Sequence, residues 1–274
     1  MRRRLWICCF TLVLSACSST RDVPIDDAKR NLSRLQFVFH ADFELPDRYS
    51  LVEELDSVGD DLHRELGLPV SEAWVQVYLF ESEEHYLEYL QTRHPRLPSR
   101  RSFFVATEDE LVIYAQWSAH VLEDLRHEIS HVYLHTMVGT TPIWLDEGLA
   151  EYFEATGGFR GRHRGHVNLL TRLYDRGDWS PDLRRLEQMQ KPEEMTLLDY
   201  AESWLWIHLL METAPDRSQW LRRYLVELQN QQRVRPLSKR TPKSERPLKR
   251  SLIQHLKWLA HHPLRCSATS RGSR

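Results

Sequence analysis

The sequence predicts an α+β fold, with an N-terminal mixed sheet and its helices followed by a mainly helical half. Short aromatic and β-branched runs such as WVQVYLF (74–80) alternate in the first half, which is typical of strands. After Ser118 apolar residues recur at helical spacing almost to Asn230. The chain has 274 residues and a formal net charge of -2, which allow one large core or two small ones and favour no nucleic-acid partner.

The first residues, MRRRLWICCFTLVLSAC, have the layout of an export signal. Three arginines precede ten largely apolar residues, a run too short for a membrane span of about 20 residues. The end of this run, LSAC (14–17), resembles the lipobox of bacterial lipoproteins. The resemblance implies a signal peptide at 1–16 and a lipidated Cys17, and Ser18 after it implies the cell envelope, at the outer membrane facing the periplasm. The alternative is a plain secretory signal in which Cys17 is an incidental thiol.

The four cysteines predict neither a disulfide nor a cysteine zinc site. Cys8 and Cys9 would leave with the signal and Cys17 would carry the lipid, so Cys266 would have no partner within the chain. No cysteine pair stands at zinc-ligand spacing in the globular region.

The expected elements of the first half are a strand, a helix, a strand, a helix and a hairpin. Residues 17–30 are polar and are expected to form a tether. Gly67 and Pro69 end the first helix and Ser82 caps the second. Strands are expected at 35–43, 74–80, 102–106 and 111–116, and helices at 47–66 and 82–90.

The second half is expected to be helical up to residue 232, where the folded domain (31–232) would end. WLWIHLLM (204–211) is its most apolar part, but eight residues form a buried helix face and no membrane span. Residues 233–250 hold eight Lys or Arg against one Glu, which predicts a solvated basic linker, with contact to anionic lipid head groups as the alternative. Residues 251–274 are expected to form a short helix and a disordered tail.

The stretch LRHEISHVYLH predicts a helix with one apolar and one polar face. On a helix over 119–137, the core side carries Leu125 and Ile129, and the opposite side carries the histidines. His127 and His131 stand one turn apart, so their imidazoles can converge on one ion, with Glu128 beside them. This is the H-E-x-x-H pattern of two zinc ligands and a carboxylate that accepts a proton from water.

A third ligand is expected from the following helix and not from His135. Eight residues of unbroken helix place His135 about 12 Å along the axis from His127, so we expect it at the surface or behind the ligands. Pro142 opens the next helix, PIWLDEGLAEYFE, and the turn between the helices lets Glu147 face the two histidines. The alternative is that the acids of this helix form a solvated stripe.

HEISH followed by WLDEGLAEYF resembles the gluzincin metallopeptidases, and specifically the peptidase MA-like group. The resemblance is specific over about residues 120–155 and looser over 35–230. It implies a zincin-like fold, with one Zn²⁺ bound by His127, His131 and Glu147. It also implies that Glu128 is the general base and acid, and that Glu151 orients the first histidine through its other ring nitrogen.

The same resemblance suggests Tyr200 as the donor to the oxyanion, although the lysine and glycine that follow this tyrosine in related aminopeptidases are missing. A core or surface tyrosine is the alternative, and His208 is a second candidate with a buried core histidine as its alternative. No G-x-M-E-N-like signature precedes the zinc helix, which favours an endopeptidase over an aminopeptidase. The resemblance also implies that the strand at 111–116 pairs its exposed edge with an extended substrate.

These patterns predict a membrane-tethered zinc metallopeptidase that acts on a peptide or protein substrate. A catalytically silent zinc-binding or scaffold lipoprotein of the cell envelope would share the same ligands. A zinc hydrolase acting on another amide, such as cell-wall peptide crosslinks, is a third hypothesis.

Overall fold

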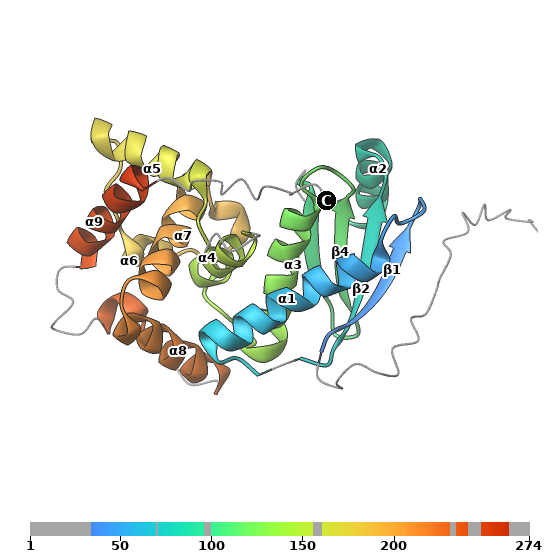
Figure 1. The fold of residues 1–274 in the computed structure, drawn as a ribbon, viewed down its shortest axis with the longest axis horizontal. Coiled ribbons are helices and arrows are strands. Elements are labelled where there is room, and N and C mark those ends of the chain that lie inside the picture. The colour runs from blue at the N-terminus through green and yellow to red at the C-terminus, as the bar shows by residue number, and fades with distance from the viewer. Residues whose placement is uncertain are drawn as a thin grey trace, which may run out of the picture.

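The computed structural model describes residues 34–69, 71–95, 100–155, 161–230, 234–240 and 248–262. The expected signal peptide (1–16), the lipidation site Cys17, the tether (17–30) and Cys266 lie outside the described residues. The described chain forms an α+β fold, as predicted, with a sheet layer and a helical half (Figure 1). Its elements are β1 (Gln36–Ala41), α1 (Arg48–Leu66), β2 (Trp74–Phe80), α2 (Glu83–Arg93), β3 (Ser102–Ala106), β4 (Leu111–Gln116), α3 (Val121–Met137), α4 (Ile143–Phe153), α5 (Arg164–Arg176), α6 (Leu183–Leu186), η1 (Pro192–Glu194), α7 (Leu197–Glu212), α8 (Pro215–Gln229), η2 (Leu237–Lys239) and α9 (Leu248–His261).

The helix ends follow the local signals of the sequence. Gly67 takes a left-handed conformation with φ of 69° and its N–H donates to the carbonyl of His63, which ends α1. The hydroxyl of Ser82 accepts from the backbone N–H of His85 and caps α2. Pro142 immediately precedes α4, where its missing N–H costs nothing.

The sheet has the strand order β1-β2-β4-β3, in which β1, β2 and β4 run parallel and β3 runs antiparallel to β4. The prediction of an exposed edge on the strand at 111–116 is therefore wrong, because β4 lies between β2 and β3. The open edge beside α3 belongs to β3. The reason is that the order of strands is set by pairing between distant segments, and the local alternation of β4 carries no information about it.

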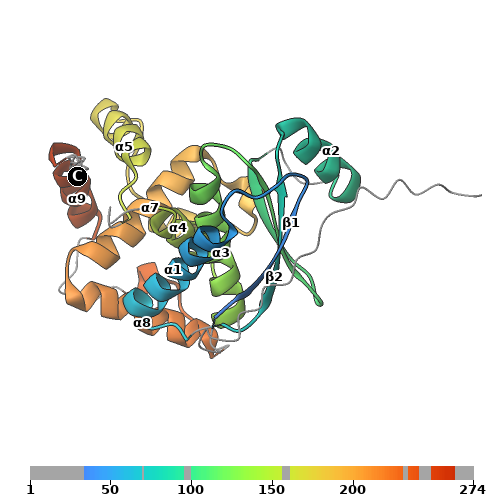
Figure 2. The ribbon, with the colours of Figure 1, turned by 45° about the vertical axis from the view of Figure 1, so that its right-hand side comes forward.

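Helices cover both faces of the sheet, as Figures 1 and 2 show. Val77 and Ile113 belong to one buried cluster together with Leu55 of α1 and Leu125 of α3. Alternate strand residues point the other way and pack with α2, where Tyr86 is buried in a smaller aromatic cluster. The sheet thus supports α3 along its apolar side and leaves the opposite side of α3 to face α4.

The helical half is built around α7, which packs most extensively against α4. The stretch 204–211 lies inside α7 and is buried but for its last residue, as expected of a core helix. No helix among the described residues is long and apolar enough to cross a membrane. The segment expected to be a linker, 233–250, contains η2 and the first three residues of α9, and α9 packs against α5 and α7.

Candidate metal centre

Helix α3 is held in place by a buried arginine next to the first histidine. Arg126 is 4% exposed, and its Nε donates to the carbonyl oxygen of Phe153 at 3.0 Å. Its Nη1 donates to Glu54 of α1 at 2.9 Å. These contacts tie α3 to the end of α4 and to α1, so they fix the depth at which His127 projects from the helix.

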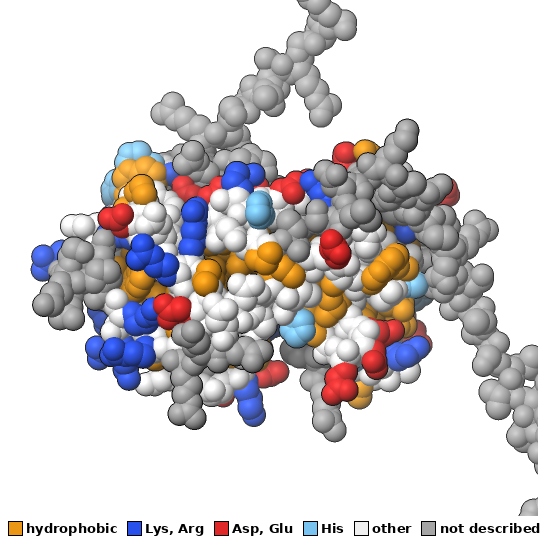
Figure 3. Space-filling view, turned by 90° about the horizontal axis from the view of Figure 1, so that it is seen from below, with side chains coloured by type: hydrophobic (Ala, Val, Ile, Leu, Met, Phe, Trp, Pro, Cys, Tyr) orange, Lys and Arg blue, Asp and Glu red, His pale blue; other side chains and the backbone are white. Residues whose placement is uncertain are grey.

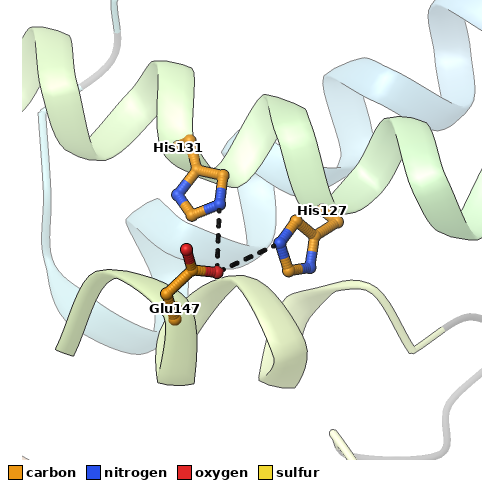
Figure 4. Close-up of side chains that lie close together, drawn as sticks. All are labelled: His127, His131 and Glu147. Atoms are coloured by element: carbon orange, nitrogen blue, oxygen red, sulfur yellow. Dashed lines mark ion pairs between the residues drawn. The ribbon is translucent and has the colours of Figure 1, made fainter. Parts of the chain in front are cut away.

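The structure brings His127 and His131 of α3 together with Glu147 of α4 (Figure 4). Oε2 of Glu147 lies 3.5 Å from Nε2 of His127 and 3.6 Å from Nε2 of His131. The glutamate is 5% exposed, and Oε2 has no hydrogen-bond partner among the described residues. Both distances exceed the 2.7–3.2 Å of an ordinary N–H···O hydrogen bond.

This arrangement fits a divalent cation better than it fits a hydrogen-bonded cluster. Donors bound at about 2.0–2.2 Å to one tetrahedral ion lie roughly 3.3–3.6 Å from one another. The two measured separations agree with that spacing. A buried carboxylate oxygen without a partner is costly, and a cation between the three atoms would remove that cost. Two imidazoles and one carboxylate are a donor set typical of zinc.

Each of the two histidines also has a carboxylate at its other ring nitrogen. Nδ1 of His127 lies 2.9 Å from Oε2 of Glu154, and Nδ1 of His131 lies 3.0 Å from Oδ2 of Asp146. The Glu154 carboxylate places a proton on Nδ1 of His127 and turns its Nε2 toward Glu147. The contact of Asp146 with His131 is a close ion pair without hydrogen-bond geometry. Neither the contact of Glu154 with His127 nor that of Asp146 with His131 was predicted from the sequence.

The expected contact between Glu151 and the first histidine is replaced by the contact from Glu154. Glu151 hydrogen-bonds through Oε2 to Nε2 of His166 of α5, at 2.7 Å. Glu154 stands three residues later, nearly one turn along α4, and reaches Nδ1 of His127. The crossing of α4 over α3 decides which of the two acids meets the ring, and helical spacing alone does not specify that crossing.

The surrounding carboxylates make the cluster attract positive charge. Burial disfavours the imidazolium form of His131, but Asp146 and Glu147 outweigh burial and raise its pKa to about 10. Burial likewise opposes protonation of His127, and Glu147 and Glu154 raise its pKa well above the usual value. Burial also works against ionised Glu147, yet the two histidines hold its carboxyl pKa far below the usual range. A proton and a metal cation therefore compete for the Nε2 atoms.

Glu128 lies beside the three donors in a cavity of about 260 Å³. Its Oε1 accepts a hydrogen bond from the hydroxyl of Ser102 of β3 at 2.7 Å, and the side chain is largely buried. Arg101 of the same segment pairs with Asp124 of α3 at 2.7 Å. Two contacts thus fasten the edge strand to α3, and one of them holds Oε1 of Glu128.

Tyr200 is brought near the cavity by α7 but does not itself line it; Arg100 does. Nη2 of Arg100 donates to the hydroxyl of Tyr200 at 2.8 Å, and the guanidinium lies 5.6 Å from the centre of the tyrosine ring. Burial and the charge of Glu147 raise the pKa of Tyr200, and Arg100 opposes this. Arg100 was not predicted from the sequence, because the two arginines before this strand belong to no motif.

The remaining histidines singled out by the sequence lie elsewhere. His135 lies exposed at the cavity wall, with its ring edge-on to Phe104 at 5.8 Å. His208 is 1% exposed in the core, and its Nδ1 lies 2.9 Å from Nε2 of His255. His208 is thus a buried core histidine, which was the alternative to a role as oxyanion donor.

A second group of donors, Glu151, His163 and His166, lies close to the first. This group differs from the first because its ring nitrogens already take part in hydrogen bonds. Nδ1 of His163 accepts from the backbone N–H of His166 and caps α5, and Nε2 of His166 meets Glu151. Nε2 of His163 lies 3.5 Å from Oε1 of Glu154, so this group supports the acid that holds His127.

His127, His131 and Glu147 thus converge without a hydrogen bond among them, and they line a cavity with the Glu128 carboxylate at its side. No protein-family model matches this chain, and no curated protein matches its sequence.

Proposed function

We propose that this chain is a zinc-dependent peptidase of the gluzincin type with a zincin-like fold. The observation that carries the proposal is the convergence of Nε2 of His127, Nε2 of His131 and Oε2 of Glu147 beside Glu128 in one cavity. Two histidines and one glutamate hold three positions of a tetrahedral ion, which is the arrangement of a catalytic and not of a closed structural site. When bound there, zinc would supply Lewis acidity toward a water and a substrate carbonyl.

Glu128 has the geometry of a general base and acid. Ser102 holds Oε1 through its hydroxyl, so Oε2 is the atom that takes the proton from the attacking water. The same oxygen then delivers the proton to the leaving amine of the cleaved peptide bond. His127 is oriented for metal binding by its hydrogen bond to Glu154, and the charge of Asp146 lies beside Nδ1 of His131.

The open edge of β3 is suited to an extended peptide. An added strand would pair with the backbone of β3 beside the cavity, which gives affinity with little dependence on side chains. Arg100 lies at the same end and can hold the developing oxyanion together with the hydroxyl of Tyr200, which still has its own proton to donate. These features support an endopeptidase that acts on peptide or protein substrates.

The proposal includes attachment to a membrane of the bacterial envelope through a lipid on Cys17. It rests on the charged, apolar and small-residue zones of the first 17 residues, which lie outside the described part of the structure.

The test is digestion of an unbiased peptide library and an unfolded protein by the parent chain and by Glu128→Gln. We expect the variant to retain one equivalent of zinc and to lose roughly 10²–10⁴-fold in hydrolysis, because the proton acceptor is gone and the ligands remain. Glu193→Gln is the matched control, since Glu193 is an exposed acid of the same cavity.

Hydrolysis by Glu128→Gln at the parent rate would overturn the mechanism. A zinc-loaded parent that cleaves no peptide, protein or peptidoglycan fragment would instead identify a catalytically silent zinc protein of the envelope.

A further inference from the structure

A groove between α5 and α9 lies in the helical half and is separate from the metal cavity. The two helices lie side by side in both ribbon views (Figures 1 and 2), and the groove between them has a volume of about 770 Å³. The described residues that line it share no member with those that line the metal cavity.

One wall of this groove is a stripe of arginines on α5. Arg164, Arg172 and Arg176 stand at intervals of four or eight residues, so their side chains project from one face of the helix. All three are exposed, and no hydrogen bond or ion pair joins them to a residue that the structure describes. Asp175 is the one acid among the described lining residues. The wall thus carries a surplus of positive charge that an anion would neutralise.

A fourth arginine is fixed in place at the end of the groove. Nη1 of Arg162 donates to the carbonyl of His262 at 2.8 Å, and its guanidinium lies 4.8 Å from the centre of the Trp258 ring. A guanidinium that is already ordered loses less conformational entropy when it binds an anion.

The floor of the groove is apolar. Val167 and Leu259 are buried there beside Ala260, and the hydroxyl of Thr171 is buried with no partner among the described residues. Trp258 is 46% exposed beside the groove, an amphipathic side chain of the kind that settles at membrane interfaces. Seen from below, in Figure 3, Lys and Arg side chains gather on the left, which is the helical end of the molecule in Figure 1.

We propose that the α5–α9 groove binds an anionic phospholipid. Arg172 and Arg176, one turn apart on α5, would hold the phosphate, since guanidinium groups match phosphate oxygens in paired hydrogen bonds. Arg162 and Arg164 would add positive charge at the other end of the groove. The floor around Val167 and Leu259 would contact the start of an acyl chain. A free phosphate would satisfy the arginines but leave this floor uncovered, and a neutral lipid would leave the arginines unpaired.

The experiment is a calorimetric titration of the full chain with water-soluble dihexanoyl phosphatidylglycerol, dihexanoyl phosphatidylcholine and inorganic phosphate. These short lipids are used below the concentration at which they form micelles. We expect saturable binding of phosphatidylglycerol with one site per chain, at least tenfold tighter than binding of the other two. We expect the double variant Arg172→Gln/Arg176→Gln to weaken this binding at least tenfold.

The matched control removes two exposed cations elsewhere, in Arg184→Gln/Lys191→Gln, and should bind like the parent. Ala260→Glu tests the floor by placing a negative charge in the groove, and it should also weaken binding at least tenfold. Unchanged binding in a folded arginine variant or in Ala260→Glu would overturn the proposal. Inorganic phosphate bound as tightly as phosphatidylglycerol would overturn the lipid assignment in favour of a free-anion site.

Discussion

The ring of His127 has a carboxylate at each of its nitrogens. Glu147 faces Nε2 and Glu154 faces Nδ1, so the ring is fixed in plane and in tautomer. Glu154 is in turn within 3.5 Å of His163, and burial together with the nearby Glu151 carboxylate raises the pKa of Glu154. The strength with which His127 would bind a metal therefore depends on Glu154 and its neighbours as well as on the proposed ligands.

Glu154→Gln and Glu151→Gln should have different effects on metal affinity. Loss of the Glu154 carboxylate removes the partner of Nδ1, and we expect zinc affinity to fall about 10–100-fold. Glu151 bonds His166 and not a ligand, so its replacement should change affinity less than about threefold. Competition with a chromophoric chelator measures both. A larger loss in Glu151→Gln than in Glu154→Gln would contradict the structural assignment.

Arg100 and Tyr200 should act as one unit in hydrolysis. We expect Arg100→Gln to lower kcat roughly 10²-fold, as does removal of an oxyanion donor in other enzymes. Tyr200→Phe should also lower kcat in the parent, but should add little in the Arg100→Gln background, because their contact is then already lost. Steady-state kinetics of the two single variants and the double variant measures the coupling. Fully multiplicative effects would show that the two residues act independently.

At this scale the sequence could predict the residues that helical spacing brings together, and it could not predict contacts between helices. His127, His131 and Glu128 follow from spacing on α3, and Glu147 follows from a short turn between two helices. The choice of Glu154 over Glu151, and the contact of Asp146 with His131, depend on the crossing of α3 and α4.

The contact between α4 and α7 depends on a residue without a side chain. A Cβ atom at Gly148 would lie 2.8 Å from the carbonyl oxygen of Ser203 and 2.9 Å from Ile207. Backbone atoms cannot move aside as a flexible side chain can. Gly148 therefore sets how closely the helix with Glu147 approaches the helix with Tyr200.

Gly148→Ala should destabilise the protein, although alanine favours helices. An unstrained Gly→Ala change inside a helix stabilises by about 0.5–1 kcal/mol. The close approach to Ser203 reverses the sign, and we expect a net loss of about 1–3 kcal/mol from overpacking. Urea denaturation followed by circular dichroism measures it. A variant more stable than the parent would show that α4 and α7 can separate freely.

The elements themselves follow closely from local signals. The strand at 74–80 and the cap at Ser82 match the structure, since alternation and capping are properties of short segments. The position of β4 inside the sheet was not predictable in this way. It results from antiparallel pairing with β3 on one side and parallel pairing with β2, which is distant in the sequence, on the other.

On the scale of the whole molecule, a buried pair of histidines joins α9 to the core. Nδ1 of His208 in α7 meets Nε2 of His255 in α9 at 2.9 Å. Burial lowers the pKa of His208 to about 3 and that of His255 to about 4, and the charge of Arg162 acts in the same direction on both. Arg217 also lowers the pKa of His255.

The fold should lose stability as the pH falls below 6.5, the usual histidine value. In the unfolded chain both histidines take up a proton there, while in the folded chain they stay neutral down to their lowered pKa values. The unfolded state then binds more protons, so the free energy of unfolding decreases with falling pH. We expect a loss of about 2 kcal/mol per histidine between pH 7 and pH 5.

Urea denaturation of the parent and of His255→Gln at both pH values isolates this effect from the other histidines. Glutamine keeps a hydrogen-bonding group at the position and does not titrate. The difference in unfolding free energy between the two pH values should be smaller in the variant. Equal differences would exclude the pair as a source of the pH dependence.

The three proposed ligands all come from one pair of consecutive helices, α3 and α4. In contrast, Ser102 comes from β3, Arg100 from the segment just before β3, and Tyr200 from α7. Metal retention therefore reports only on a local hairpin of the chain, and turnover reports on long-range assembly. A preparation with a full complement of zinc can still be inactive if β3 or α7 is displaced. If the proposed function holds, metal content alone would thus be a poor measure of the active fraction of this protein.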